Sequence, residues 1–136
     1  MTPVFFYGLF MDAALLREKG LHPTAGKIAW ADGYGLRIGA RATLVRAESE
    51  RAYGVVASLT RDELDRLYSG PGVSEYLPEQ LEVCDQSGGK TTVLCYNLPL
   101  SKLAGSNPEY AKALAVVAEK CGMPASYVEE ILSWTK

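Results

Sequence analysis

A glycine-containing turn near the N-terminus gathers groups that could bind an anion. Residues 4–7 form an uncharged, β-prone run that predicts a strand buried on both faces. Gly8 follows directly, and residues 11–17 have the pattern of a short helix. Such a junction brings free backbone N–H groups together, which can hold a carboxylate. The alternative is a strand that only needs a tight turn, because strand–glycine–helix junctions are common.

The cysteines and the single histidine give no pattern for metal or nucleophile chemistry. Cys84, Cys95 and Cys121 are far apart, and no Cys-x-x-Cys pair occurs. His22 lies before a proline, in a predicted loop. No recognised zinc spacing is present, so we expect no metal site. The cysteines are typical of small apolar residues in a reducing cytosol, and a Cys–His nucleophile pair has no supporting motif.

Composition predicts one globular domain over residues 1–136. The chain is 48% hydrophobic and 22% charged, and its net charge is −2 from 14 basic and 16 acidic residues. The basic residues are scattered, so no nucleic-acid partner is indicated. No apolar run is long enough for a bilayer, and no secretory signal pattern is present, which favours a cytoplasmic protein. No pattern specifies an oligomeric state.

Most of the first half has the period-2 pattern of strands. Residues 28–38 alternate around a bend or bulge expected at Asp32-Gly33. Residues 42–46 and 52–59 predict two more strands, and the polar run 48–51 between them predicts a hairpin.

The second half adds helices and one hairpin. Thr60 and Glu63 match a capping box that opens a helix ended by residues 70–72. Strands are expected at 80–84 and 92–96. Asn107 precedes Pro108 at a helix start, and Ser126 to Glu129 offers a second capping box. This order predicts an α+β domain: a small mixed, mostly antiparallel β-barrel flanked by helices, with a pocket at one mouth.

Five segments in order resemble the gamma-glutamylcyclotransferase-like superfamily, in its avirulence-induced-gene-like branch. The resemblance covers nearly the whole chain. The segments are Tyr7-Gly8-Leu9-Phe10-Met11, the strand 52–59, the helix 62–67 with the later Tyr76, the hairpin 83–96 and the tail 118–127.

The resemblance implies a small helix-flanked barrel that converts γ-glutamyl amines or peptides into 5-oxoproline and a free amine, as in glutathione metabolism. The substrate's α-amine attacks its own γ-carbonyl, which requires a carboxylate as general acid/base and donors for the developing oxyanion. It implies no cofactor and a small γ-glutamyl-type partner. The matching substrate-binding residues are Tyr7, Gly8, Leu9, Phe10 and Tyr76.

The chain departs from the family pattern at the acid/base position. The place of the family's glutamate falls on Tyr68, and the nearest carboxylate is Glu75. One hypothesis makes Glu75 the catalytic residue, which predicts a partly buried carboxyl with a raised pKa. The alternatives are a solvated Glu75 and a non-catalytic small-molecule binder on the same fold. Packing is expected of Tyr68, and Leu9 and Phe10 in place of polar residues predict a more apolar pocket.

Overall fold

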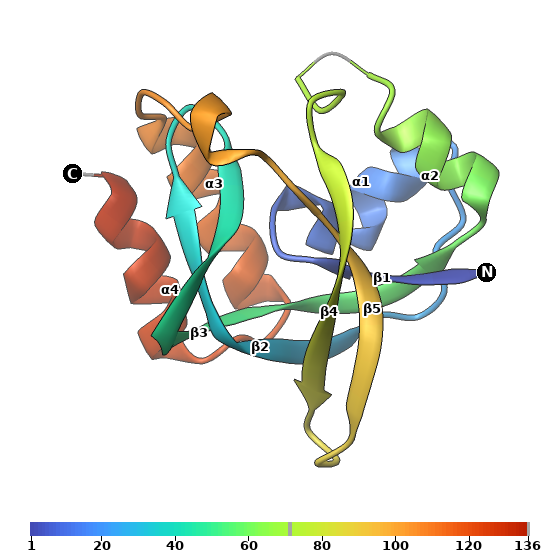
Figure 1. Cartoon of the computed structure of the whole chain (residues 1–136), viewed down its shortest axis with the longest axis horizontal. Coiled ribbons are helices and arrows are strands. Elements are labelled where there is room, and N and C mark those ends of the chain that lie inside the picture. Colours follow the sequence, from blue (N-terminus) through green and yellow to red (C-terminus); the bar gives the residue numbers. More distant parts are fainter. Residues whose placement is uncertain (71, 136) are drawn as a thin grey trace.

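Five strands form a closed barrel in the order β1-β3-β2-β4-β5 (Figure 1). The computed structural model describes residues 1–70 and 72–135. The strands are β1 Thr2–Phe6, β2 Lys27–Ile38, β3 Ala42–Leu59, β4 Leu77–Asp85 and β5 Lys90–Asn97. Neighbouring strands are antiparallel except β1 and β5, which pair in parallel at Val4 and Leu94 and close the barrel. The predicted mixed barrel is confirmed.

Helices cover two sides of the barrel. In Figure 1, α1 and α2 lie on the side of the N-terminus, and α3 and α4 lie on the far side beside β2 and β3. The helical segments are η1 Leu9–Met11, α1 Ala13–Glu18, α2 Arg61–Leu67, η2 Leu100–Lys102, α3 Pro108–Lys120, α4 Ala125–Leu132 and η3 Ser133–Thr135. Within the described residues, no helix combines the length and hydropathy that a membrane crossing requires.

The hairpin predicted at residues 48–51 is wrong, because β3 is one strand of 18 residues. Its polar residues pair across the sheet instead of turning. Arg37 holds Glu50 through two hydrogen bonds of 2.9 and 2.7 Å, and Arg51 holds Asp32 at 2.6 Å. The bend predicted at Asp32-Gly33 is confirmed: the register shifts there, and Gly33 has a φ of 82° that favours glycine.

Side-chain caps fix the starts of α1, α2 and α3, and at α1 the Asp12 side chain accepts from the Ala14 N–H at 3.0 Å. Thr60 and Glu63 form the predicted capping box, and Asn107 accepts a hydrogen bond from the Tyr110 N–H at 3.0 Å. The second predicted capping box is wrong, because α4 begins at Ala125 and Ser126 already lies inside it. Pro124 precedes this helix without a side-chain cap. Glu63 also accepts from the His22 N–H at 2.6 Å, which ties the loop after α1 to α2.

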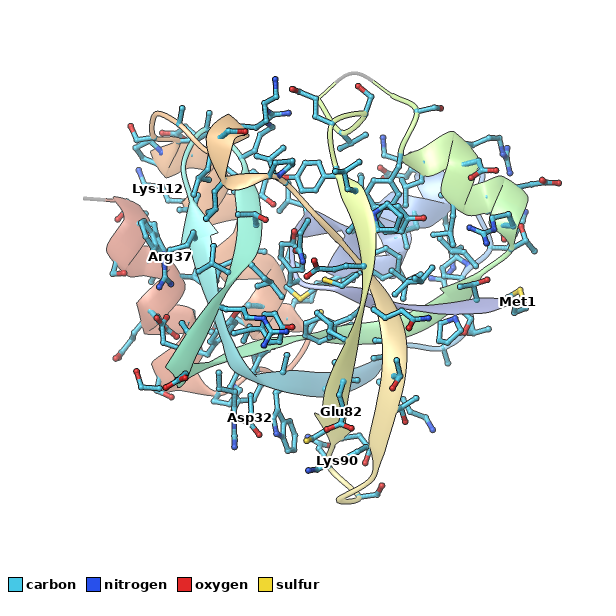
Figure 2. All side chains as sticks on the ribbon, viewed as in Figure 1. Met1, Asp32, Arg37, Glu82, Lys90 and Lys112 are labelled. Carbon is cyan, nitrogen blue, oxygen red and sulfur yellow. The ribbon has the colours of Figure 1, made fainter. Side chains whose placement is uncertain are left out.

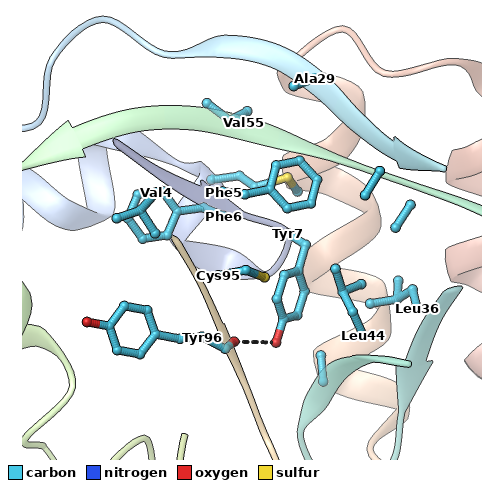
Figure 3. Packing of buried hydrophobic residues seen from close by; sticks show 14 of the residues in the cluster. Val4, Phe5, Phe6, Tyr7, Ala29, Leu36, Leu44, Val55, Cys95 and Tyr96 are labelled. Carbon is cyan, nitrogen blue, oxygen red and sulfur yellow. Dashed lines mark hydrogen bonds between the residues drawn. The ribbon is translucent and has the colours of Figure 1, made fainter. Parts of the chain in front are cut away.

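β1 lies at the centre of the core. Val4, Phe5 and Phe6 are at most 2% exposed, and Figure 3 shows them packed beneath β3. Gly54 on β3 permits this approach, since a Cβ there would lie 2.5 Å from the Phe6 carbonyl oxygen. The strand therefore ends at Tyr7 and Gly8 with its side chains already fixed in the core.

Candidate functional site

A cavity of about 290 Å³ opens where β1 ends. Aromatic side chains from five segments dominate its wall: Phe5, Phe6, Tyr7, Phe10, Tyr68, Tyr76, Tyr96 and Tyr110. The remaining lining residues are Gly8, Leu9, Leu15, Lys19, Arg41, Ala42, Gly72 and Val73. The cavity therefore contains Tyr7, Gly8, Leu9, Phe10 and Tyr76 together, although their role in substrate binding stays a prediction.

The turn after β1 forms part of the cavity wall and contains backbone N–H groups without a backbone acceptor. The short helix η1 begins at Leu9, and the Met11 N–H donates to the Gly8 carbonyl at 3.0 Å. Among the described residues, the N–H groups of Gly8 and Phe10 have no backbone acceptor, as expected at a helix start. A Cβ on Gly8 would lie 2.7 Å from the Tyr110 hydroxyl oxygen, so glycine lets that hydroxyl reach the turn.

Tyr7 is fixed by a buried hydrogen bond. Its hydroxyl donates to the Tyr96 carbonyl at 2.7 Å, and the residue is 6% exposed (Figure 3). The ladder partner of Tyr96 is Pro78, which has no N–H to offer. Burial is the main cause of a Tyr7 pKa well above its ordinary value, and the neighbouring Cys95 adds to it. This phenol therefore supports the cavity wall as a neutral group.

Tyr68 lies at the end of α2 and forms another wall. Its ring stacks on Tyr96 with centroids 3.8 Å apart and an interplanar angle of 7°, and it forms a T-shaped pair with Phe10 at a centroid distance of 5.9 Å. The expected packing role is thus observed, but the same ring lines the cavity. Burial raises its pKa well above the ordinary value, so its hydroxyl stays protonated at neutral pH.

Glu75 lies in an ion-pair cluster at the surface. Its side chain is 43% exposed and contacts Arg41 at 2.9 Å and Lys102 at 3.2 Å. The hydrogen bond from Arg41, followed by that from Lys102, lowers its pKa. The expectation of a buried carboxyl with a raised pKa is therefore wrong, because two cations stabilise its charged form. Glu75 is not among the described lining residues, and a catalytic role for it stays a prediction.

The charge at the cavity is positive. Arg41 and Lys19 are part of its wall, and no Asp or Glu is among the described lining residues. The Arg41 guanidinium is close enough to the Tyr76 hydroxyl to oppose the burial that raises its pKa. Tyr76 itself donates to the Ala42 carbonyl. Within the described residues, no group of three or more His, Cys, Asp or Glu side chains could hold a metal ion.

Sequence reasoning missed Lys19, Arg41, Tyr96 and Tyr110 as cavity residues. They come from four distant segments, and none belongs to a local motif. The closing of the barrel brings them together. The terminal tyrosine of β5, which the resemblance already included, was the one available signal for Tyr96.

Comparisons with known proteins agree with this geometry. The chain is 26% identical over 97 residues to gamma-glutamylcyclotransferase of Bos taurus, covering 70% of this chain and 52% of that protein. It therefore spans about half the length of this curated relative. The solved structure of an uncharacterised protein from Homo sapiens superimposes with a TM-score of 0.79 at 22% identity, over 96% of this chain and 85% of the other.

A structure named gamma-glutamyl cyclotransferase has a TM-score of 0.77 at 19% identity, again over 96% and 85% of the two chains. At such identities these structures show the shared fold. The sequence model of the AIG2-like family matches residues 51–131, which is more than half of the chain. The protein therefore belongs to the AIG2-like family, within the gamma-glutamylcyclotransferase-like superfamily.

Proposed function

We propose that the protein binds a small carboxylate-bearing molecule in the tyrosine-lined cavity without cyclising it. The observation that carries this proposal is the charge of the wall: Arg41 and Lys19 line the cavity, and no Asp or Glu is among its described lining residues. Guanidinium and backbone N–H donors suit a carboxylate.

Cyclisation of a γ-glutamyl amide needs a group that accepts a proton from the attacking amine. A carboxylate does this near neutral pH, whereas a tyrosine with a raised pKa holds its own proton. Tyr68 occupies the place that the family resemblance gives to the acid/base glutamate, and burial raises its pKa. This substitution supports binding without turnover.

The second candidate is a gamma-glutamylcyclotransferase that uses Glu75 as general acid/base. One contact favours it: Glu75 bonds directly to Arg41, which lines the cavity. The bovine relative carries the name of this activity.

Two assays on wild type and Glu75→Gln separate the candidates. The first measures 5-oxoproline release from a panel of γ-glutamyl amines and peptides. The second measures binding of glutarate, 5-oxoproline, glutathione and aryl carboxylates by titration calorimetry. Glu82→Gln is the matched control, because Glu82 is exposed on β4 and, among the described residues, forms an ion pair only with Lys90, at 3.9 Å (Figure 2).

We expect no 5-oxoproline from any variant. Glu75→Gln should bind anions about two- to fivefold more tightly, since it leaves Arg41 and Lys102 without a negative partner. Turnover by wild type that disappears only in Glu75→Gln would instead make the protein a cyclotransferase. The cytosol is the compartment we propose, and the three cysteines are free thiols, as a reducing compartment favours.

A further inference from the structure

We infer that the cavity selects carboxylates with a flat apolar body and no ammonium group, such as arylalkanoic acids, over the matching α-amino acids. This inference rests on the proposed binding function and names its ligand class. It is carried by the polarity of the groups that face the cavity.

Tyrosine hydroxyls belong to several residues that line the cavity, among them Tyr7, Tyr68, Tyr76 and Tyr110. Those of Tyr7 and Tyr76 already donate to backbone carbonyls. At Tyr68 and Tyr110 the bonding differs: the Leu9 backbone N–H bonds to the Tyr110 oxygen, and within the described residues neither hydroxyl donates a hydrogen bond to a protein acceptor. Burial keeps these phenols protonated. A protonated phenol can donate to a carboxylate oxygen, but its oxygen can also accept from an ammonium group, so the discrimination against an amine comes from the charge of the wall.

The charged side chains in and beside the cavity wall have a positive net charge. Glu75 is shared by Arg41 and Lys102, so these three side chains together remain positive. Lys19 adds another positive charge to the wall and has no ion-pair partner in the described part of the chain. An α-ammonium inside the cavity would face like charges and would find no carboxylate among the described lining residues.

Aromatic rings can also attract cations, which would favour a ligand with an ammonium group. Cation–π binding needs a free ring face. One face of Tyr68 is covered by Tyr96 at a centroid distance of 3.8 Å, and the Tyr68 ring also packs against Phe10 in a T-shaped contact. Arg41 and Lys19 oppose any cation electrostatically. The rings therefore favour a neutral, flat part of the ligand.

Aliphatic and aromatic side chains of the cavity wall suit the apolar part of the ligand. Leu9 and Phe10 stand where the resemblance places polar side chains, and both line the cavity together with Leu15. A cavity of about 290 Å³ with such walls suits a ring and a short chain. Burial of the ring against these side chains would supply most of the affinity, and Arg41 would orient the carboxylate.

The test uses probes that differ only in the amine. Calorimetry compares 3-phenylpropionate with phenylalanine, and glutarate with glutamate, on wild type. We expect 3-phenylpropionate to bind at least about tenfold more tightly than phenylalanine, because the ammonium would be buried without a carboxylate partner. We also expect it to bind more tightly than glutarate. Equal or tighter binding of phenylalanine would overturn the inference.

Variants at position 68 test the mechanism. Tyr68→Phe should weaken 3-phenylpropionate severalfold, since it removes one donor and keeps the stack. Tyr68→Glu should narrow or reverse the preference for the amine-free acid, because it supplies a negatively charged acceptor for ammonium. The same changes at Tyr34, which lies beneath Arg46 away from the cavity, serve as controls and should leave both affinities unchanged. An unchanged preference in a folded Tyr68→Glu protein would contradict the inference.

Failure of the inference can be told apart from failure of the proposed function. If the anions of the wider panel bind but the matched pairs bind equally, only the ligand class is wrong. If 5-oxoproline is released, or if no anion binds, the proposed function fails and the inference fails with it.

Discussion

Two hollows of similar size lie on this barrel, and they differ in their charged groups. The tyrosine-lined cavity has a volume of about 290 Å³, and the second hollow, of about 310 Å³, lies between β3 and α4. Both contain tyrosines. The second is lined by two serines, two tyrosines, one arginine and two glutamates, namely Ser49, Glu50, Arg51, Tyr53, Ser126, Tyr127 and Glu130.

The pKa of a nearby glutamate is shifted in opposite directions at the two hollows. Beside the tyrosine-lined cavity, Glu75 is paired with Arg41 and Lys102, and their hydrogen bonds lower its pKa. In the second hollow, Glu50 is paired with Arg37, but burial and the charge of Glu50 raise the pKa of Glu130. The first hollow has many more aromatic side chains in its wall, but volume does not distinguish the two. The sign of the charge on the wall does, and only the first is suited to an anion.

The largest effect should follow a change at Gly54, which lies between the two hollows. Its neighbour Tyr53 lines the second, and Phe5 and Phe6 line the first. Gly54→Ala would place a Cβ 2.5 Å from the Phe6 carbonyl oxygen. We expect a loss of about 2–4 kcal/mol of unfolding free energy, measured by urea denaturation.

Gly89→Ala is the control for Gly54→Ala. A Cβ there makes ordinary contacts, the nearest at 3.4 Å, and should change stability by less than about 0.5 kcal/mol. If the two variants unfolded alike, the close approach of β1 and β3 would not limit the fold.

A smaller difference in stability is expected between two Tyr→Phe variants, one at each hollow. Tyr7→Phe removes a buried hydrogen bond to the Tyr96 carbonyl and should cost about 1 kcal/mol. Tyr127→Phe removes a buried hydroxyl that has no partner within the described residues and should be neutral or stabilising. Both proteins would be unfolded in urea under the same conditions. A larger loss for Tyr127→Phe would mean that its hydroxyl is bonded after all.

The smallest effect concerns Glu130 and pH. Its folded pKa lies above its unfolded value, so the folded state prefers the protonated form and its charge lowers stability at neutral pH. Glu130→Gln should therefore be more stable than wild type at pH 7, by a few tenths of a kcal/mol for this exposed group. The advantage should disappear as the pH falls below about 4.5, the ordinary value.

Glu75→Gln should have the opposite sign at pH 7, because cations lower the pKa of Glu75. Unfolding curves at pH 7 and pH 4 would measure both differences. If both variants changed the free energy of unfolding at pH 7 in the same direction, the electrostatic distinction between the hollows would be wrong.

Local signals in the sequence predicted most of the fold. The Thr60 capping box, the Asn107 cap and the bulge at Gly33 depend on neighbouring residues alone, and all three are present. Residues 48–51 were misjudged because their charges are satisfied by residues 13–19 positions away, on another strand. Only the sheet register decides whether such a polar run turns or continues.

The candidate site was predictable only in part. Tyr7, Gly8, Leu9 and Phe10 are contiguous and form a recognisable motif. Lys19, Arg41 and Tyr110 meet them only through tertiary structure, and their isolated positions carry no signal. The position of Glu75 was misjudged for a related reason, since the cations that hold it are 34 and 27 residues away in sequence.

The parallel pairing of β1 with β5 has a consequence for the order of folding during synthesis. β1 is made first, but it pairs with β3 and with Leu94 of β5. A nascent chain must therefore leave one edge of this uncharged, aromatic segment unpaired on the ribosome until β5 has emerged, because β3 covers only the other edge. During this interval, chaperones that bind extended apolar segments can bind β1. The cavity that Phe5 and Phe6 of β1 later line cannot yet bind a ligand.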